Sequence, residues 1–420
     1  MQRAYYYLGG DALHTGIYVD LIRRLEEEDL VVHLVPRLRV SPNPASLIHA
    51  WRNRHLLGPN RIEAIRGQIR GEVHPLPVWN LAPGLSGPRL ARIAGLPGRG
   101  ERRVVMHARQ IVMALLALTL KRRWPDLRVI AELEGDDLAQ LECHQSKTPR
   151  PSPSLRLRWS LERSYYQRAY RRILRESDAV NCVSKNLRDA VVRRCGLNGA
   201  QAARLHVIPT IASRKEFFFD PDRRDRTRRA LALEDRFVVI YSGNLRGPWQ
   251  RPDQMVEAFR MIRQCRSTAF FLVLTGEAER SIIEPHLSRA GIAPEDHRVT
   301  SCPHREVGDH LCAADVGLIL LDRHPATEAG APTKLGEYAL SGLPIVMTDG
   351  VGDFSAEMRD VEWACVLPDL TDREAMRDRI QRFCGLDFTP ARRAAFSAWA
   401  SERFATEISV PRLAQLYRSV

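Results

Sequence analysis

Residues 314–350 read ADVGLILLDRHPATEAGAPTKLGEYALSGLPIVMTDG, and this stretch decides the fold class. It begins with an apolar run, VGLILL, which is typical of a strand buried on both faces. A polar loop follows, and we expect a helix to begin at Pro332–Thr333 because proline is favoured at the first helical position. A second apolar run, LPIVM, leads into a turn at Gly350. A strand, a helix and a strand in this order predict a parallel sheet covered by helices.

The same alternation extends along the rest of the chain. Apolar runs that read as strands are AYYYLGG, VVHLVPR, RVVMHAR, LRVIAELEG, DAVNCVS, RFVVIYSGNL and TAFFLVLTGE. Because 420 residues are too many for one ordinary core, we predict an α/β protein with two Rossmann-like, doubly wound parallel-sheet domains facing a cleft. The predicted boundaries are 1–212 for the first domain, 213–390 for the second, and 391–420 for a C-terminal helix that packs back towards the first domain.

The positive charge of the chain is concentrated in its first half. Residues 1–220 hold 36 Lys+Arg and 21 Asp+Glu, a balance of +15, whereas residues 221–420 hold 27 and 29, a balance of −2. An arginine-rich but merely solvated surface explains this excess as well as an anionic partner does. The anionic partners to consider are a membrane surface, a phosphorylated acceptor and nucleic acid.

Cysteine usage and hydropathy indicate a cytoplasmic protein. The eight cysteines are scattered without a CxxC pair, so no zinc site is predicted and reduced thiols are expected. The N-terminus lacks the apolar stretch of a signal peptide. The most apolar segment, residues 111–120, is too short to span a bilayer and reads as a buried core helix. Peripheral contact with the inner face of the membrane is the alternative location.

Three loops are predicted to lie at the carboxyl ends of the strands, where open parallel sheets bind ligands. They are Gly9–Gly10 with Asp11, the turn after Gly243, and the segment that precedes Lys334. Lys334 falls in the first turn of its helix, where a bound anion would offset the unfavourable helix dipole. Glu337 lies one turn later on the same face as Thr333 and Lys334, where a carboxylate accepts hydrogen bonds from a ribose diol. The bland alternatives are a solvated lysine and an ordinary surface glutamate.

The segment APTKLGEYALSGLPIV, with the preceding ADVGLILL, resembles the donor-site signature of family 4 glycosyltransferases. Other segments resemble the same family in the family's order. They are VVMHAR, IAELEGD, ESDAVNCVSKNLRDAVV, RLHVIPT and YSGNLRGPWQRPDQMVEAF. The resemblance implies a GT-B fold of the glycogen synthase or group 1 type, a nucleotide-sugar donor and a retaining reaction.

The resemblance also implies roles for individual residues. As catalytic residues it indicates His107, Lys334, Arg246 and Glu328. As donor-binding residues it indicates Gly9, Gly10, Gly243, Asn244, Arg251, Gly330, Thr333 and Glu337. The chain departs from the family pattern at two positions. Ala329 stands where the family has the first glutamate of a pair, with Glu328 adjacent but off register, and Asn244 stands where the family has an arginine.

We therefore expect a hexosyltransferase that moves a sugar from a UDP- or GDP-sugar to a glycan or lipid-linked acceptor in cell-surface polysaccharide assembly. Neither a metal nor another cofactor is expected, because the DxD-like triplet at Asp220 and the Asp136–Asp137 pair lack further ligands nearby. The alternatives are a nucleotide-sugar epimerase of the same fold and a non-catalytic family member. A nucleic-acid-binding protein would fit the basic half, but the aromatic platforms of such modules are missing, so no nucleic acid is expected.

Overall fold

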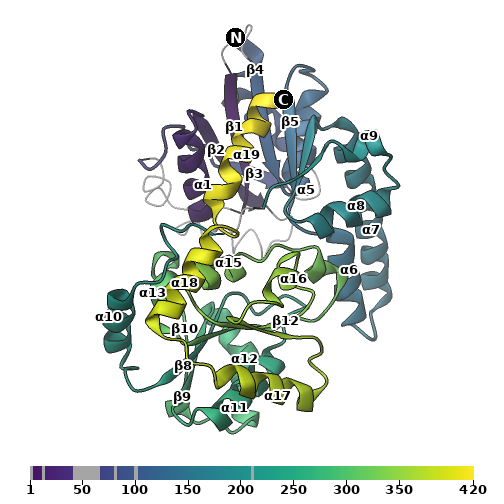
Figure 1. Cartoon of the computed structure of the whole chain (residues 1–420). Coiled ribbons are helices and arrows are strands. Elements are labelled where there is room, and N and C mark those ends of the chain that lie inside the picture. The colour runs from purple at the N-terminus through teal and green to yellow at the C-terminus, as the bar shows by residue number, and fades with distance from the viewer. Residues whose placement is uncertain (1–2, 12–14, 41–66, 80–82, 99–102, 210–211) are drawn as a thin grey trace. The chain divides into compact units, whose positions relative to one another are not determined.

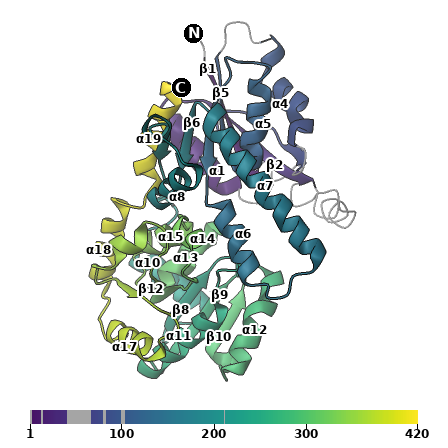
Figure 2. The same ribbon diagram turned by 90° about the vertical axis from the view of Figure 1, so that its right-hand side faces the viewer.

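The computed structural model describes residues 3–11, 15–40, 67–79, 83–98, 103–209 and 212–420, and the chain forms two compact units (Figures 1 and 2). Unit 1 consists of residues 1–138, 151–209 and 409–420. Unit 2 consists of residues 139–150 and 210–408. Residues 139–150, which the sequence analysis assigned to the first domain, therefore group with the second sheet, and the last twelve residues group with the first.

Unit 1 is built on a parallel sheet of seven strands in the order β3-β2-β1-β4-β5-β6-β7. The strands are β1 (Arg3–Asp11), β2 (Val32–Val40), β3 (Leu76–Trp79), β4 (Arg103–Arg109), β5 (Arg128–Leu133), β6 (Ala179–Cys182) and β7 (Leu205–Val207). The central strands are buried and mostly apolar, and all but the end residues of β4 are buried. This is the pattern of a sheet covered on both faces.

Helices cover both faces of this sheet. The helices of unit 1 are α1 (Thr15–Glu27), α4 (Gly87–Ile93), α5 (Ile111–Lys121), α7 (Pro153–Glu176), α8 (Lys185–Cys195), α9 (Gly199–Ala202) and most of α19 (Thr406–Ser419). Helix α6 (Asp137–Ser146) groups mostly with unit 2. Helices α1 and α19 share one hydrophobic cluster with the strands. Helix α5 lies on α7 and on β4 and β5, and its burial confirms the core helix expected from residues 111–120.

Unit 2 contains a parallel sheet of six strands in the order β10-β9-β8-β11-β12-β13. The strands are β8 (Phe237–Ser242), β9 (Ala269–Leu274), β10 (His297–Thr300), β11 (Val316–Ile319), β12 (Ile345–Thr348) and β13 (Ala364–Leu367). Numbered from β8, the strand order is 3-2-1-4-5-6, which is that of a dinucleotide-binding Rossmann sheet. The two parallel sheets confirm the predicted fold class.

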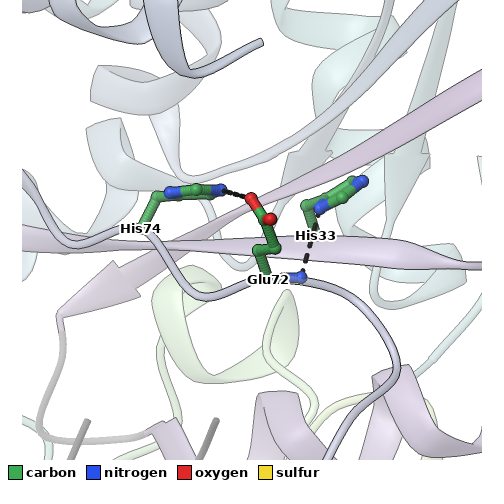
Figure 3. A group of neighbouring side chains, drawn as sticks. All are labelled: His33, Glu72 and His74. Atoms are coloured by element: carbon green, nitrogen blue, oxygen red, sulfur yellow. Dashed lines mark hydrogen bonds and ion pairs between the residues drawn. The ribbon is translucent and has the colours of Figure 1, made fainter.

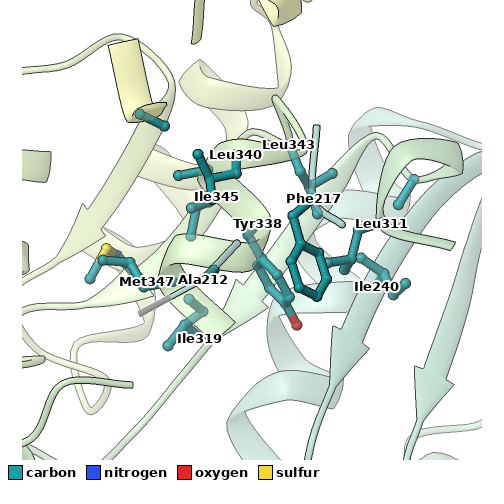
Figure 4. Close-up of a cluster of buried hydrophobic side chains, with 14 of the residues drawn as sticks. Ala212, Phe217, Ile240, Leu311, Ile319, Tyr338, Leu340, Leu343, Ile345 and Met347 are labelled. Atoms are coloured by element: carbon teal, nitrogen blue, oxygen red, sulfur yellow. The ribbon is translucent and has the colours of Figure 1, made fainter. Parts of the chain in front are cut away.

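Two hydrophobic clusters flank the second sheet. The helices of this unit are α10 (Pro221–Leu231), α11 (Pro252–Cys265), α12 (Arg280–Arg289), α13 (His304–Ala313), α14 (Pro325–Glu328), α15 (Thr333–Leu340), α16 (Phe354–Met358), α17 (Arg373–Cys384) and α18 (Pro390–Ser401). Helices α11, α12 and α17 supply one cluster. The other forms around Tyr338 of α15 and includes Phe217, Leu311 and Ile345 (Figure 4).

Two segments rich in proline or glycine contain helices. Residues 143–157 lie largely in α6 and α7, which leaves only residues 147–152 between them. Ser152 ends this connection by capping α7, because its hydroxyl accepts a hydrogen bond from the N–H of Leu155 and Pro153 follows at the first helical position. Residues 83–98 form α4 between two short 3-10 helices.

Within the part of the chain that the structure describes, no helix has both the length and the apolar character that a membrane crossing requires.

Gly342 and Gly291 provide a matched test of how tightly α15 packs in unit 2. Both have positive φ, +59° and +65°. A Cβ on Gly342 would lie 2.4 Å from the carbonyl oxygen of Arg393, whereas one on Gly291 would meet nothing within 4 Å. We expect Gly342→Ala to lower the free energy of unfolding by about 3 kcal/mol or more and Gly291→Ala by about 1 kcal/mol. Urea unfolding followed by tryptophan fluorescence measures both, and equal losses would contradict this packing.

Candidate functional site

The strand order of unit 2 places a topological switch point between β8 and β11. The chain moves outward from β8 through β9 to β10, and outward on the other side from β11 through β12 to β13. In open parallel sheets the carboxyl ends of two such strands are where ligands bind. Two segments begin there: the loop after β8, which starts at Gly243, and the segment after β11 that leads into α15. Both had been predicted to line the site.

Lys334 connects these two segments. Its Nζ donates a hydrogen bond to the hydroxyl of Tyr241 on β8 at 3.1 Å and lies 4.3 Å from the centroid of the same ring. Gly243, with φ +137°, makes this contact possible, because a Cβ there would lie 2.9 Å from Nζ. The Tyr241 hydroxyl in turn donates to the carbonyl oxygen of Asn244 at 2.8 Å. The strand end, the following turn and α15 are therefore held together around one amine.

The amine of Lys334 is poorly compensated. Burial lowers the pKa of Lys334 to about 8, and the charge of Glu337 raises it only in part. The remaining contact is the Tyr241 ring, whose π face attracts a cation but cannot neutralise it. The amine also lies in the first turn of α15, next to backbone N–H groups that have no partner within the helix. This arrangement favours an anion, which would neutralise Nζ and accept hydrogen bonds from the helix N-terminus.

Glu337 is partly buried one turn after Thr333 and Lys334. Burial raises its pKa, against the charges of His304 and Lys334 and a hydrogen bond from Thr333, which lower it. His304 is the first residue of α13, and its Nδ1 lies 3.8 Å from a carboxylate oxygen of Glu216. The carboxylate therefore lies within the electrostatic reach of two basic side chains, and it keeps acceptor capacity for hydroxyl groups of a ligand.

The loop after Gly243 is shaped by Asn244 and fixed to the segment after β11. The side-chain oxygen of Asn244 accepts a hydrogen bond from the N–H of Arg246 at 2.6 Å, which forms an Asx turn. The loop then joins the other segment through the N–H of Asp322, which donates to the carbonyl oxygen of Trp249 at 2.8 Å. Asn244 thus supplies turn geometry where the family pattern has a cation.

The two arginines of this loop differ in availability. Arg251 directly precedes α11, and its guanidinium pairs with Asp253 at 2.8 Å and Asp322 at 2.7 Å. Both carboxylates would compete with a phosphate for it. Arg246 is 59% exposed and has only a 3.4 Å contact with Glu279. Of the two, Arg246 is the cation that a ligand can recruit.

The predicted residues before α15 lie on a rigid turn. Glu328 ends α14 and pairs with Arg323 at 3.3 Å, while Ala329 is buried. Gly330 packs against Gly352, where a Cβ would lie 2.4 Å from the carbonyl oxygen of Gly330. Glu328 therefore points towards Arg323, and the buried methyl group of Ala329 leaves no carboxylate in the family's position.

In unit 1 the corresponding switch point lies between β1 and β4. Gly9 and Gly10 lie within β1, not in a turn after it, and the pairing of β1 with β2 shifts register between Leu8 and Asp11. His107 on β4 is fully buried. Its Nδ1 lies 2.8 Å from the Tyr417 hydroxyl and its Nε2 lies 3.1 Å from a carboxylate oxygen of Glu132. The ring is thus enclosed among side chains of its own unit.

Glu132 is the centre of this buried network. Burial raises its pKa, but the hydrogen bond and charge of His107, the charge of Arg109 and a hydrogen bond from Asn181 outweigh burial and bring the pKa to about 2. Asp136, a further acceptor candidate, is buried and pairs with Arg194 at 3.0 Å. Both carboxylates are therefore engaged by cations of unit 1.

One group among the described residues has the composition of a metal site. His33, Glu72 and His74 lie together in unit 1, with their ligand atoms within 4.8 Å of one another (Figure 3). Nε2 of His74 lies 2.8 Å from Glu72, and Nδ1 of His33 accepts a hydrogen bond from the N–H of Glu72 at 3.1 Å. That bond occupies the Nδ1 lone pair of His33. The group belongs to unit 1, whereas Lys334 and Glu337 belong to unit 2.

The structure thus brings together Lys334, Gly243, Asn244, Thr333 and Glu337 in unit 2. The sequence analysis missed Tyr241 and His304 there. Tyr241 could have been found from strand alternation, because it is two residues before Gly243 and its side chain shares a face with residue 243. His304 carries no such signal, because its approach to Glu337 depends on how α13 packs against α15.

A comparison with protein families matches residues 236–385 to the family Glycosyl transferases group 1. No curated protein sequence matches the chain significantly. Among solved structures, sucrose-phosphate synthase from Thermosynechococcus elongatus has a TM-score of 0.70 at 16% identity and covers 100% of this chain and 99% of its own.

Two further solved structures share the fold. Anabaena HepE in complex with UDP has a TM-score of 0.65 at 15% identity, with both chains covered completely. WaaG, a glycosyltransferase involved in lipopolysaccharide biosynthesis, has a TM-score of 0.62 at 14% identity and covers 99% of this chain and 98% of its own. These likenesses show that the chain has the GT-B fold of these proteins.

The buried Glu132 gives a test of the His107 network. Its folded pKa of about 2 lies below the ordinary value of 4.5, so its contribution to stability is present above pH 4.5 and is lost as pH falls towards 2. We expect Glu132→Gln to cost on the order of 3 kcal/mol at neutral pH and progressively less below pH 4.5. Urea unfolding at several pH values measures the difference, with the exposed Glu234→Gln as control. A difference that does not change with pH would contradict the network.

Proposed function

Because residues 236–385 match the family Glycosyl transferases group 1, we propose that this protein transfers a sugar from a nucleotide diphosphate sugar to an acceptor hydroxyl with retention at the anomeric carbon. The observation that carries the proposal is the amine of Lys334, held between the Tyr241 ring and Gly243 at the switch point of the second sheet. A diphosphate would supply the negative charge that is missing around this amine. The first turn of α15 would donate backbone N–H hydrogen bonds to the same phosphates.

In the proposed reaction the acceptor oxygen attacks the anomeric carbon as the bond from that carbon to the diphosphate oxygen breaks. The acceptor's proton passes to an oxygen of the departing phosphate. Negative charge grows on the diphosphate as the bond breaks, and Lys334, Arg246 and the N-terminus of α15 stabilise it where it forms. These cations would supply the positive charge that a metal ion supplies in other transferases. We therefore propose that the reaction needs neither a metal nor another cofactor.

Glu337 is proposed to hold the donor ribose. Its carboxylate lies one helical turn from Lys334, so a nucleotide whose phosphates lie at the helix start would place its sugar hydroxyls near this side chain. HepE was solved with UDP and with UDP-glucose, and we therefore propose a UDP-sugar as the first donor to examine. Gly330 and Thr333 complete the donor site through their backbone.

Three sequence-based roles change in this proposal. Arg251 stabilises the loop through Asp253 and Asp322, and Glu328 pairs with Arg323. His107 positions β4 against α19 through Tyr417. Each side chain is engaged within its own unit, so we assign it a positioning role. The proposed acceptor is a glycan or a lipid-linked glycan, which meets unit 1 near the β1–β4 switch point.

Lys334 should control donor affinity. We expect Lys334→Met to weaken UDP binding about 10- to 100-fold, because a charge-assisted contact to phosphate is lost. Isothermal titration with UDP measures this, and Lys185→Met, on an exposed lysine of α8, is the control. Unchanged affinity in Lys334→Met would contradict the donor site. Release of free sugar or of an epimer without acceptor would favour hydrolase or epimerase activity, and binding without any turnover would favour a non-catalytic protein.

The pKa of Lys334 sets the pH dependence of donor binding. Below pH 8 the free amine is protonated, and above pH 8 it must take up a proton to bind the diphosphate, since its pKa is about 8 before the anion arrives. Affinity for UDP should therefore fall up to about tenfold per pH unit above pH 8. Lys334→Arg keeps its charge throughout, so it should bind without this alkaline fall. A wild-type profile that is flat between pH 7 and 9.5 would count against the assignment.

A further inference from the structure

Helix α7 is longer than the sheet it covers. Its 24 residues extend about 36 Å, whereas β4, with seven residues, extends about 23 Å. Helix α7 ends at Glu176 and the chain enters β6 at Ala179, so the C-terminus of the helix lies at the amino ends of the strands. Its first turns therefore project past their carboxyl ends, and Figure 2 shows this long helix in front of β5 and β6.

The projecting part is less buried than the rest of the helix. The buried residues of α7 are Ala169, Tyr170, Ile173 and Leu174, all in its last third. Residues 153–168, which we call the arm, contain none. Tertiary packing normally stabilises a helix in a protein, and in the arm this packing is only partial, with Tyr165 and Tyr166 half-buried. A partner outside the chain would account for an arm of this length.

The arm exposes two leucines. Leu157 and Leu161 are 63% and 61% exposed, and their spacing of four residues places them on one face of the helix. Single exposed leucines are common in proteins, but two on adjacent turns of a projecting helix form an apolar edge. Among the described residues only Leu85 is a more exposed large apolar side chain.

Arginines continue the same face towards the other end of the helix. From Leu161 the spacing of seven, three and four residues leads to Arg168, Arg171 and Arg175, all exposed. Helix α7 carries seven arginines and two glutamates, a balance of +5. It therefore accounts for a third of the +15 of residues 1–220.

We propose that the α7 arm docks unit 1 on an anionic membrane surface, with Leu157 and Leu161 entering the boundary between head groups and acyl chains. The arginines of the same face then meet lipid phosphates. A second copy of the chain fits this face less well, because the arginine rows of the two copies would repel each other. The apolar surface of two leucines is also far smaller than the roughly 800 Å² that a stable interface buries on each partner.

This surface would also select the acceptor. The arm projects at the carboxyl ends of the strands, the same edge as the β1–β4 switch point. A lipid-linked acceptor anchored in the bilayer would thus be presented on the side where unit 1 is proposed to bind it. This last step rests on the proposed function, whereas the docking itself does not.

Co-sedimentation of the full chain with vesicles tests the docking. We expect binding to vesicles of phosphatidylcholine containing about one third phosphatidylglycerol, and little binding to phosphatidylcholine alone. Leu157→Ser with Leu161→Ser should lower the partition coefficient at least tenfold. Arg168→Gln with Arg171→Gln should lower it by a similar factor and weaken its dependence on salt.

Matched controls lie elsewhere on the surface. Val31→Ser changes an exposed apolar residue of unit 1 just ahead of β2, and Arg226→Gln with Arg229→Gln removes two exposed arginines of α10. Neither should change vesicle binding. Because the leucines and arginines changed in the arm are exposed, all variants should keep the melting temperature and UDP affinity of the wild type.

Three results would overturn the docking: no binding of the wild type to anionic vesicles, equal binding by the leucine variant, or a leucine variant that converts a dimer to a monomer without losing vesicle binding. The last would assign the face to a second copy. A wild type that binds vesicles but not UDP would instead count against the proposed function, so the two failures can be told apart.

Discussion

The contact between Lys334 and Tyr241 is the interaction on which the candidate site depends. It places a cation at the start of α15, where the helix dipole opposes it, and gives it an aromatic ring as its close partner. The cost appears in the lowered pKa of Lys334, which burial causes. A protein that tolerates such a charge without a ligand gains in affinity when an anion arrives, because the anion removes an existing electrostatic penalty.

This contact in turn depends on the core of unit 2. Tyr338, at the centre of one hydrophobic cluster, accepts a hydrogen bond from the N–H of Ser242 at 2.7 Å. That bond fixes Ser242, the last residue of β8, directly before Gly243. Leu335 and Leu340 of α15 are themselves buried in the core. The position of one amine is thus set by residues whose main role is packing, so core substitutions near Tyr338 would alter ligand binding without touching the ligand.

Local signals in the sequence were sufficient for the fold and for locating the segments that form much of the candidate site. The apolar run before Asp322 and the proline before Thr333 are short-range features, and they located β11 and the start of α15 correctly. Long-range partners were beyond such reasoning. His107 is enclosed by Tyr417, 310 residues away, and Arg251 is engaged by Asp322 across the switch point. A basic side chain near a strand end looks the same in the sequence whether it meets a ligand or a carboxylate.

The two switch points differ in whether their buried charges have partners of opposite charge within the protein. In unit 1, His107 and Arg109 contact the carboxylate of Glu132 inside the sheet, and these contacts lower the pKa of Glu132 and stabilise its charge. In unit 2, burial of Lys334 acts in the opposite sense, towards the neutral amine. A network whose charges are already paired resists a new ligand, because binding must first break the existing ion pairs. A cation without a full partner is instead stabilised when an anionic ligand binds. This asymmetry, more than the shared fold, is our reason for proposing that the phosphates of a donor bind to unit 2 and that the acceptor binds to unit 1.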